Sequence, residues 1–291
     1  MSNTDSTIQM MTEAQVREPK STVGLFTLPC GYLDAEGTLH TEVLLREISG
    51  KEEDMLASKK VPDQKKMNQL LIACIERIGS ITDRERIAAA VPELLVGDRV
   101  FLLIAIRRTS LGDDYPYKDQ CPSCEKESLM SINLGDIETA PMPEPTKRIF
   151  DARLPSKVAT RVWADTGELP PAEKTNPTGP TVRFRPVTGK DEEKFGQVLN
   201  KDDALSKSLQ ARIELLDGKP PTVDDLQALS LTERQYLRDE IFDHADGGVE
   251  TTLDVTCPKC GHDYTRELEI GQMGFFFPSA ARKNSKTRSS T

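Results

Sequence analysis

The chain repeats itself, and this duplication limits its possible folds more than any other feature of the sequence. FTLPCGYL at 26–33 matches ARLPSKVA at 152–159, and VLLREISGKEEDML at 43–56 matches VRFRPVTGKDEEKF at 182–195. A third block, QCPSCEKESLMSINLGDIE, matches TCPKCGHDYTRELEIGQMG. The blocks keep the same order at offsets of 126, 139 and 136 residues, so one insertion of 13 residues and one deletion of 3 align them. An ordered duplication predicts two copies of one structural unit.

The duplication divides the chain of 291 residues into two units of ordinary domain size with flanking segments. The insertion in the second unit is rich in Pro, Gly, Thr and Asn, which is typical of an exposed loop. Both ends are polar with few large apolar groups, which predicts disorder. The expected organisation is a disordered N-terminal tail at 1–22, repeat A at 23–140, a Pro-rich linker at 141–148, repeat B at 149–278 with its 13-residue loop insertion near 163–180, and a basic disordered tail at 279–291.

Hydrophobic periodicity predicts a mixed α+β fold in each repeat. TEVLLREISG at 41–50 is typical of a strand, and the apolar stripe of 64–80 has helical spacing. A second helix is expected at 97–112, ending at its glycine. Its counterpart begins with a capping box from Ser230 to Glu233 and is expected to stop at Gly247-Gly248. The alternating segments after each cysteine pair read as strands.

The repeated Gly50-Lys51 and Gly189-Lys190 pairs invite comparison with a phosphate-binding loop. Each lacks the upstream glycine and the Ser or Thr after the lysine that such a loop needs. The acidic run after each pair is typical of the first turn of a helix, where carboxylates meet the positive end of the helix dipole. We therefore expect a strand-to-helix turn in both repeats.

Each repeat contains one C-P-x-C motif between a short strand and an alternating strand. One such pair is a weak signal, but two pairs at the same place in two copies favour a metal site, because structural zinc prefers four tetrahedral thiolates. The pairs lie 132 residues apart, so the site closes only if the two repeats pack with their hairpins together. We predict one shared structural Zn²⁺ ion with the ligands Cys121, Cys124, Cys257 and Cys260.

Two other interpretations of the cysteine pairs stay open at this point. Separate knuckles without metal would leave the pairs apart, whereas a redox dithiol would place each pair at the N-terminus of a helix. We expect His262 to be an exposed residue of the knuckle, because four cysteines already complete the site. Cys30 and Cys74 lie outside the motifs and are expected to be free thiols.

Composition limits the function classes. A net charge of −9 and a pI near 5.1 argue against a dedicated nucleic-acid binder. No apolar run reaches the roughly 18 residues of a membrane span, and no secretory signal is recognisable, so we expect a cytoplasmic setting with reduced thiols. No nucleotide-binding or hydrolase motif occurs, and only three histidines are present. We therefore predict no catalytic residues and no cofactor-binding residues apart from the metal ligands.

The chain resembles a family of T4-like bacteriophage baseplate hub and tail assembly proteins, whose relatives also occur with bacterial contractile injection systems. The resemblance rests on FTLPCGYLDAEGTLHTEVLLREISGKEEDMLA, VGDRVFLLIAIRRTSLGDDY, CPSCEKESLMSINLGDIE and the FFFP ending. It covers repeat A well and repeat B more loosely, where the insertion departs from it. The resemblance implies a non-enzymatic structural or chaperone-like component of a baseplate hub. Its implied partners are other tail or baseplate proteins, and its implied location is the bacterial cytoplasm during assembly or the finished tail particle.

Two alternatives come from other classes: a zinc-ribbon adaptor that binds nucleic acid or regulates transcription, and a thiol-disulfide redox protein. An adaptor would need a basic face, yet the basic residues near the motifs are offset by acidic ones. The basic residues are Lys126, Lys259 and Arg266; the acidic ones are Asp119, Glu125, Glu127, Asp263, Glu267 and Glu269. The aromatic run Phe275–Phe277 is expected either to form a docking surface or to cover the core of repeat B. Partner identity and oligomeric state stay open.

Overall fold

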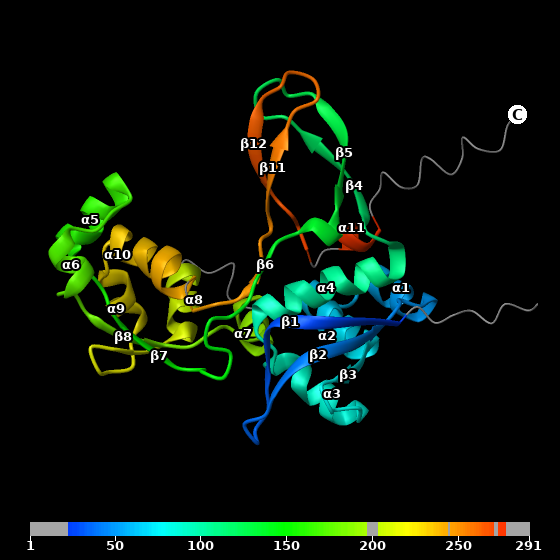
Figure 1. The fold of residues 1–291 in the computed structure, drawn as a ribbon, viewed down its shortest axis with the longest axis horizontal. Coiled ribbons are helices and arrows are strands. Elements are labelled where there is room, and N and C mark those ends of the chain that lie inside the picture. Colours follow the sequence, from blue (N-terminus) through cyan, green and yellow to red (C-terminus); the bar gives the residue numbers. More distant parts are fainter. Residues whose placement is uncertain (1–22, 197–202, 244, 271–272, 278–291) are drawn as a thin grey trace, which may run out of the picture.

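The computed structural model describes residues 23–196, 203–243, 245–270 and 273–277. Two α+β bodies lie side by side, and two β-hairpins stand together as one tower over the body formed by the first half of the chain (Figure 1). The expected disordered tails at 1–22 and 279–291 lie outside the described residues.

The two bodies share a common order of strands and helices, to which repeat B adds two helices between its first two strands. Repeat A comprises β1 (Val23–Leu33), β2 (Leu39–Arg46), α1 (Gly50–Ala57), α2 (Asp63–Cys74), β3 (Ile75–Ile78), α3 (Arg84–Ala90), η1 (Val91–Glu93) and α4 (Val96–Leu111). Repeat B comprises β7 (Phe150–Arg153), α5 (Lys157–Thr166), α6 (Pro171–Thr175), β8 (Thr181–Phe184), α7 (Gly189–Gly196), α8 (Ala204–Arg212), β9 (Ile213–Leu216), α9 (Val223–Ala228), α10 (Leu231–Tyr236) and the π-helical η3 (Leu237–Phe242).

The tower and its base are formed by the segments that follow α4 and η3. From repeat A they are β4 (Asp114–Gln120), β5 (Glu127–Asn133), η2 (Leu134–Asp136) and β6 (Thr139–Ala140). From repeat B they are β10 (Gly248–Val249), β11 (Thr252–Thr256), β12 (Asp263–Glu267) and α11 (Met273–Phe276).

The sheets confirm the two homologous α+β repeats. Both have three antiparallel strands in the same order, β1-β2-β3 and β7-β8-β9. The pairing of the central strand with the last strand shifts register at the same place in both, between Leu44 and Leu45 and between Arg183 and Phe184. An irregularity shared by both sheets is a detail of local geometry that two unrelated sheets would not be expected to share.

The helix expected over 64–80 is shorter than predicted. It ends at Cys74, and the chain continues directly as β3, in which Ile75 and Ile78 pair with Leu45 and Val43 of β2. Both isoleucines are fully buried. A stripe of buried apolar residues is compatible with a helix or with a strand. Residues 75–78 form a strand because they pair with β2, which lies about thirty residues earlier in the sequence.

The second pair of helices follows the prediction more closely. α4 runs from Val96 to Leu111, and Gly112 ends it with a positive φ of 83°. The capping box is present at the start of α10, where the Ser230 N–H donates to Glu233 Oε2 at 2.7 Å. This helix continues as η3 and ends at Phe242 instead of reaching Gly247.

The insertion in repeat B is helical, although its composition indicated a loop. α5 and α6 lie between β7 and β8, and α5 ends at the left-handed Gly167. Trp163 on α5 stacks edge-on against Tyr236 of α10, with ring centroids 5.0 Å apart, and donates its indole N–H to Glu240 at 3.1 Å. Packing against α10 therefore stabilises a helix in a Pro- and Gly-rich neighbourhood.

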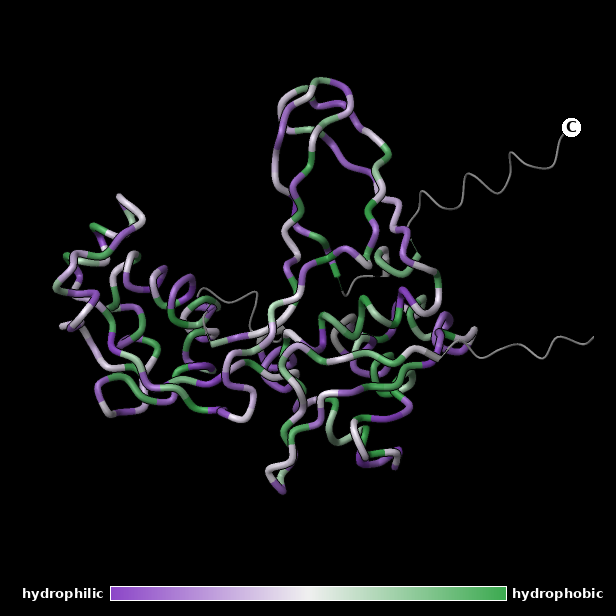
Figure 2. Tube along the Cα trace, viewed as in Figure 1, coloured by the Kyte–Doolittle hydropathy of each residue, from purple (hydrophilic) through white to green (hydrophobic). Residues whose placement is uncertain are grey.

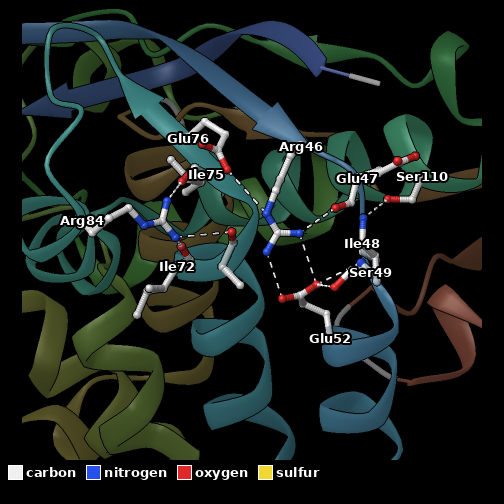
Figure 3. Close-up of polar contacts among 11 residues, drawn as sticks. Arg46, Glu47, Ile48, Ser49, Glu52, Ile72, Ile75, Glu76, Arg84 and Ser110 are labelled. Atoms are coloured by element: carbon white, nitrogen blue, oxygen red, sulfur yellow. Dashed lines mark hydrogen bonds and ion pairs between the residues drawn. The ribbon is translucent and has the colours of Figure 1, made fainter. Parts of the chain in front are cut away.

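Both Gly-Lys pairs form strand-to-helix turns, as predicted. In repeat A, Arg46 at the end of β2 pairs with Glu52 in the first turn of α1 (Nη2 to Oε1, 2.9 Å), and Ser49 Oγ donates to the same carboxylate (Figure 3). The Arg46 guanidinium lowers the pKa of Glu52 to about 2. Repeat B reproduces the arrangement, with Arg185 Nη1 2.7 Å from Asp191 Oδ2.

The two repeats exchange the segments that follow their hairpins. Phe275 and Phe276 of repeat B are buried in the core of repeat A, so the segment is neither an exposed docking surface nor a cover for repeat B. Arg107 of α4 is also buried and donates to the Phe275 carbonyl at 3.0 Å. In return, Met142 of the linker is buried in the core of repeat B. Figure 2 shows the hydrophobic stretches concentrated along α4 and the sheet beside it, with the tower more hydrophilic.

Candidate metal centre

The two hairpins bring the two C-P-x-C motifs together at the tip of the tower. β4 and β5 pair antiparallel up to Gln120 and Glu127, and β11 and β12 pair up to Thr256 and Asp263. Each motif therefore occupies the turn directly after the last strand pair of its hairpin. The tips meet because both hairpins rise side by side over repeat A (Figure 1).

The four predicted sulfur ligands form one compact cluster. All Sγ atoms of Cys121, Cys124, Cys257 and Cys260 lie within 4.8 Å of one another. The Cys121–Cys260 and Cys124–Cys257 sulfurs are 3.7 and 3.8 Å apart, so the close contacts run between the repeats. Four thiolates bonded at about 2.3 Å to a tetrahedral ion stand about 3.8 Å apart, so the cluster has the dimensions of a structural zinc site.

The backbone of both turns has the same conformation. The Cys121 N–H donates to the Lys126 carbonyl at 3.3 Å, and the Cys257 N–H donates to the His262 carbonyl at 2.9 Å. The fourth residue after the first cysteine has positive φ in each turn, 56° at Glu125 and 73° at Gly261. Glycine adopts this region without strain, whereas glutamate does so at a cost, so the turn of repeat A is held by its surroundings.

A backbone donor favours the ionised form of one thiol. The Lys259 N–H donates to Cys257 Sγ at 3.4 Å and lowers the pKa of that thiol to about 7. Thiolates are the species that bind metal. The turn therefore favours the thiolate of Cys257, whereas desolvation and the neighbouring thiols raise the pKa of Cys260 to about 12.

A polar contact joins the hairpins beneath the cysteines. Asp119 of β4 is buried, and its Oδ2 accepts a hydrogen bond from Tyr264 Oη at 2.8 Å. Its Oδ1 pairs with Arg266, whose guanidinium also lies over the Tyr117 ring, 5.2 Å from the centroid. Sequence reasoning missed this contact and counted Asp119 and Arg266 only among the charges that offset one another near the motifs. The sequence held only a weak signal of this contact: Tyr264 and Arg266 are two residues apart in a strand and therefore lie on the same face of it.

The other residues considered in the sequence analysis, His262, Cys30 and Cys74, do not belong to the four-cysteine cluster. His262 is exposed, and its ring stacks on Tyr264 with centroids 6.2 Å apart. Cys30 and Cys74 are free, as expected, and fully buried. Burial raises the pKa of both thiols, that of Cys74 to about 12, so both stay protonated.

The alternative interpretations fit the geometry less well. Separate knuckles would leave the two pairs apart, yet sulfurs of different repeats lie 3.7 and 3.8 Å from each other. A redox dithiol of the kind considered above starts a helix, whereas each pair here lies between two antiparallel strands.

Fold and site together define a two-repeat α+β protein whose halves meet at a four-cysteine cluster. The family described as T4 bacteriophage base plate protein matches residues 33–160 and 167–285. The first segment covers most of repeat A, the linker and the start of repeat B, and the second covers nearly all of the rest of repeat B. The chain therefore belongs to this family. No match was found among curated proteins or among solved structures. Among the described residues, no helix has the length and apolarity to cross a membrane.

Proposed function

We propose that this protein is a non-enzymatic structural or assembly component of the baseplate hub of a contractile phage-type tail or injection system. The observation that carries the proposal is the family match, which covers both repeats. Its partners are other tail or baseplate proteins, which it meets in the bacterial cytoplasm during assembly or in the tail particle itself.

The architecture supports a scaffold. The repeats are joined at the four-cysteine cluster, at the β6–β10 strand pair, and through the exchanged segments that place Phe276 and Met142 in each other's cores. These connections involve different parts of the chain, so together they restrict the movement of one repeat relative to the other. A rigid body of this kind suits a part that positions other proteins.

Zinc at the cluster is the second element of the proposal. The sulfur spacing suits tetrahedral zinc, and an all-cysteine set is a donor set that structural zinc uses. The four cysteines would hold one ion, with two ligands from each repeat. Because the site forms only when the chain folds, metal binding would stabilise the folded state.

Deletion of the gene from the genome that encodes it tests the hub role. We expect negative-stain electron microscopy to show no complete tails, and plasmid-borne wild-type protein to restore them. Normal tails without the gene would contradict the proposal. Mass spectrometry of purified tails then separates the two forms of the role, because a hub component stays in the particle and an assembly chaperone leaves it.

A further inference from the structure

One contact inside the chain docks the first turn of α7, in repeat B, onto the start of α4, in repeat A. The Val96 N–H donates to the Val187 carbonyl at 2.9 Å, and the Gly189 N–H donates to the Leu94 carbonyl at 3.0 Å. Behind these backbone bonds, Arg99 Nε donates to Glu192 Oε2 at 2.6 Å. The contact is therefore an edge-to-edge backbone pairing supported by a charge pair.

Gly189 makes the close approach possible. It is buried, and a Cβ added there would stand 2.6 Å from the Arg99 guanidinium. A larger residue at this position would collide with the Arg99 side chain, which is itself buried and held by hydrogen bonds to Glu192 and Asn68.

The duplication gives each side of this contact a second copy. We call 48–53 the donor turn of repeat A, because Ile48, Gly50 and Glu53 correspond to Val187, Gly189 and Glu192 by their distance from the start of α1 and α7. We call 229–234 the acceptor edge of repeat B, because Leu229, Leu231 and Arg234 correspond to Leu94, Val96 and Arg99 by their distance from the start of α10 and α4.

The donor turn is open. Gly50 is exposed, and a Cβ added there would meet no atom within 4 Å. Among the described residues, neither the Gly50 N–H nor the Ile48 carbonyl has a hydrogen-bond partner. Arg46, Ser49 and Ser110 hold the turn in shape from behind (Figure 3).

The acceptor edge is open too. Leu231 is 76% exposed, and in the part of the chain that the structure describes neither its N–H nor the Leu229 carbonyl has a partner. Arg234 makes no ion pair with a described residue. α5 packs beside this edge through Thr160, whose Oγ1 lies 3.1 Å from Thr232 Oγ1, and leaves Leu231 uncovered.

A second leucine marks the same face of repeat B. Leu205 on α8 is 76% exposed. Its counterpart by distance from the following strand is Met67 on α2, the helix that receives α7, and Met67 is only 7% exposed. Met67 is therefore buried on the helix that α7 contacts, whereas its counterpart Leu205 is exposed on repeat B.

We propose that a second copy of this chain docks here, with the donor turn of one copy on the acceptor edge of the next. Glu53 would then meet Arg234 as Glu192 meets Arg99. α1 and α10 lie at opposite ends of the molecule, so one chain presents both faces at once (Figure 1). A head-to-tail contact of this kind generates a ring if the rotation closes and a filament if it does not.

The contact between copies is weaker than the internal one. Inside the chain Lys190 also pairs with Glu93, but the position equivalent to Glu93, three residues before α10, is Ala228. We therefore expect copies to associate only at raised protein concentration. The proposal is independent of the base plate role, since it rests on the duplicated contact alone.

Two variants test the proposal, one designed to block the donor turn and one designed to block the acceptor edge. Gly50→Tyr fills the open space at the donor turn, and Leu231→Asp puts a charge on the acceptor edge at a helix start, where an acid is compatible with folding. Ala57→Tyr at the other end of α1 and Leu129→Asp on the exposed face of β5 are the matched controls.

Sedimentation velocity over a concentration series measures the oligomeric state of each protein. We expect the wild type and both controls to associate beyond the dimer, and each blocked variant to stay monomeric. A mixture of the two blocked variants should form a one-to-one dimer that grows no further, because each partner keeps only one working face. A monomeric wild type, or blocked variants that associate like the wild type, would overturn the proposal.

A charge exchange tests the register of the contact. Glu53→Arg and Arg234→Glu should each weaken association by about tenfold, and the double variant should recover it. A double variant no better than the single ones would show that the two side chains do not meet.

Discussion

Tyr264 Oη donates a 2.8 Å hydrogen bond to Oδ2 of Asp119, and this bond joins β12 of repeat B to β4 of repeat A beneath the four cysteines. Arg266 pairs with the other oxygen of the same carboxylate. The hairpins are thus held together by protein contacts as well as by the cluster.

Asp119→Asn should therefore weaken metal binding without removing a ligand. The substitution takes away the charge that pairs with Arg266, so the two hairpins are held together less firmly and the folded site binds metal more weakly. Competition with a chromophoric zinc chelator measures the affinity. Tyr264→Phe removes one hydrogen bond only and should have a smaller effect. Equal affinity in all three proteins would show that the contact plays no part in organising the site.

Glu125→Gly should stabilise the turn of repeat A. Glu125 has φ of 56°, a region that glycine adopts freely, and the equivalent position in repeat B is already Gly261. We expect a gain of up to about 1 kcal/mol in the free energy of unfolding of the metal-loaded protein, measured by urea denaturation. Gly261→Ala is the converse variant and should lose a similar amount. A loss of stability in Glu125→Gly would contradict this account of the turn.

Phe276→Ala should destabilise repeat A, although the residue belongs to repeat B. Its side chain is fully buried in the repeat A core, and truncation of a buried phenylalanine costs about 3–5 kcal/mol. Hydrogen exchange should show the first loss of protection in α4 and not in the β7–β9 sheet. Phe277→Ala, at a half-buried neighbouring position, is the control and should change less. Loss of protection confined to repeat B would refute the exchanged arrangement.

Asp98→Asn should raise stability near neutral pH. Burial raises the pKa of Asp98 to about 6, and among the described residues its Oδ2 has no hydrogen-bond partner. Below about pH 4 the carboxyl is protonated in both the folded and the unfolded state, so it costs nothing. As the pH rises from about 4 to 6 the unfolded chain loses this proton first, and the folded state is penalised by up to about 3 kcal/mol.

The pH dependence separates this effect from a general change in packing. Urea midpoints of Asp98→Asn should exceed those of the wild type at pH 7.5 and approach them at pH 4, because the asparagine carries no charge at either pH. Asp165→Asn, at an exposed position, should shift neither midpoint. The same gain at both pH values would argue against a buried charge.

The internal duplication made much of the fold and the cysteine cluster predictable. Matching Cys121 to Cys257 by alignment implied a shared site, because both hairpins follow the same elements. Periodicity could not tell that Ile75 begins a strand, since burial on a sheet and on a helix selects the same side chains. Nor could it assign Phe276 to repeat A, because which core a terminal segment covers depends on how the repeats pack.

The supporting residues of the site were also beyond sequence reasoning. Asp119 and Arg266 lie in different repeats and meet only in the folded chain. The composition of the insertion predicts a loop. Trp163 instead packs on Tyr236 of α10 and donates a hydrogen bond to Glu240 of η3, and these contacts favour a helix.

Metal content tests the central claim most directly, namely that the two repeats share one zinc ion bound by two cysteines from each. We predict one equivalent of zinc per chain by plasma mass spectrometry of protein purified under reducing conditions. Cys124→Ser and Cys257→Ser, one from each repeat, should both lose the metal, and each should lower the stability of both repeats together. Less than a few tenths of an equivalent in the wild type, or damage confined to one repeat in either variant, would contradict the account.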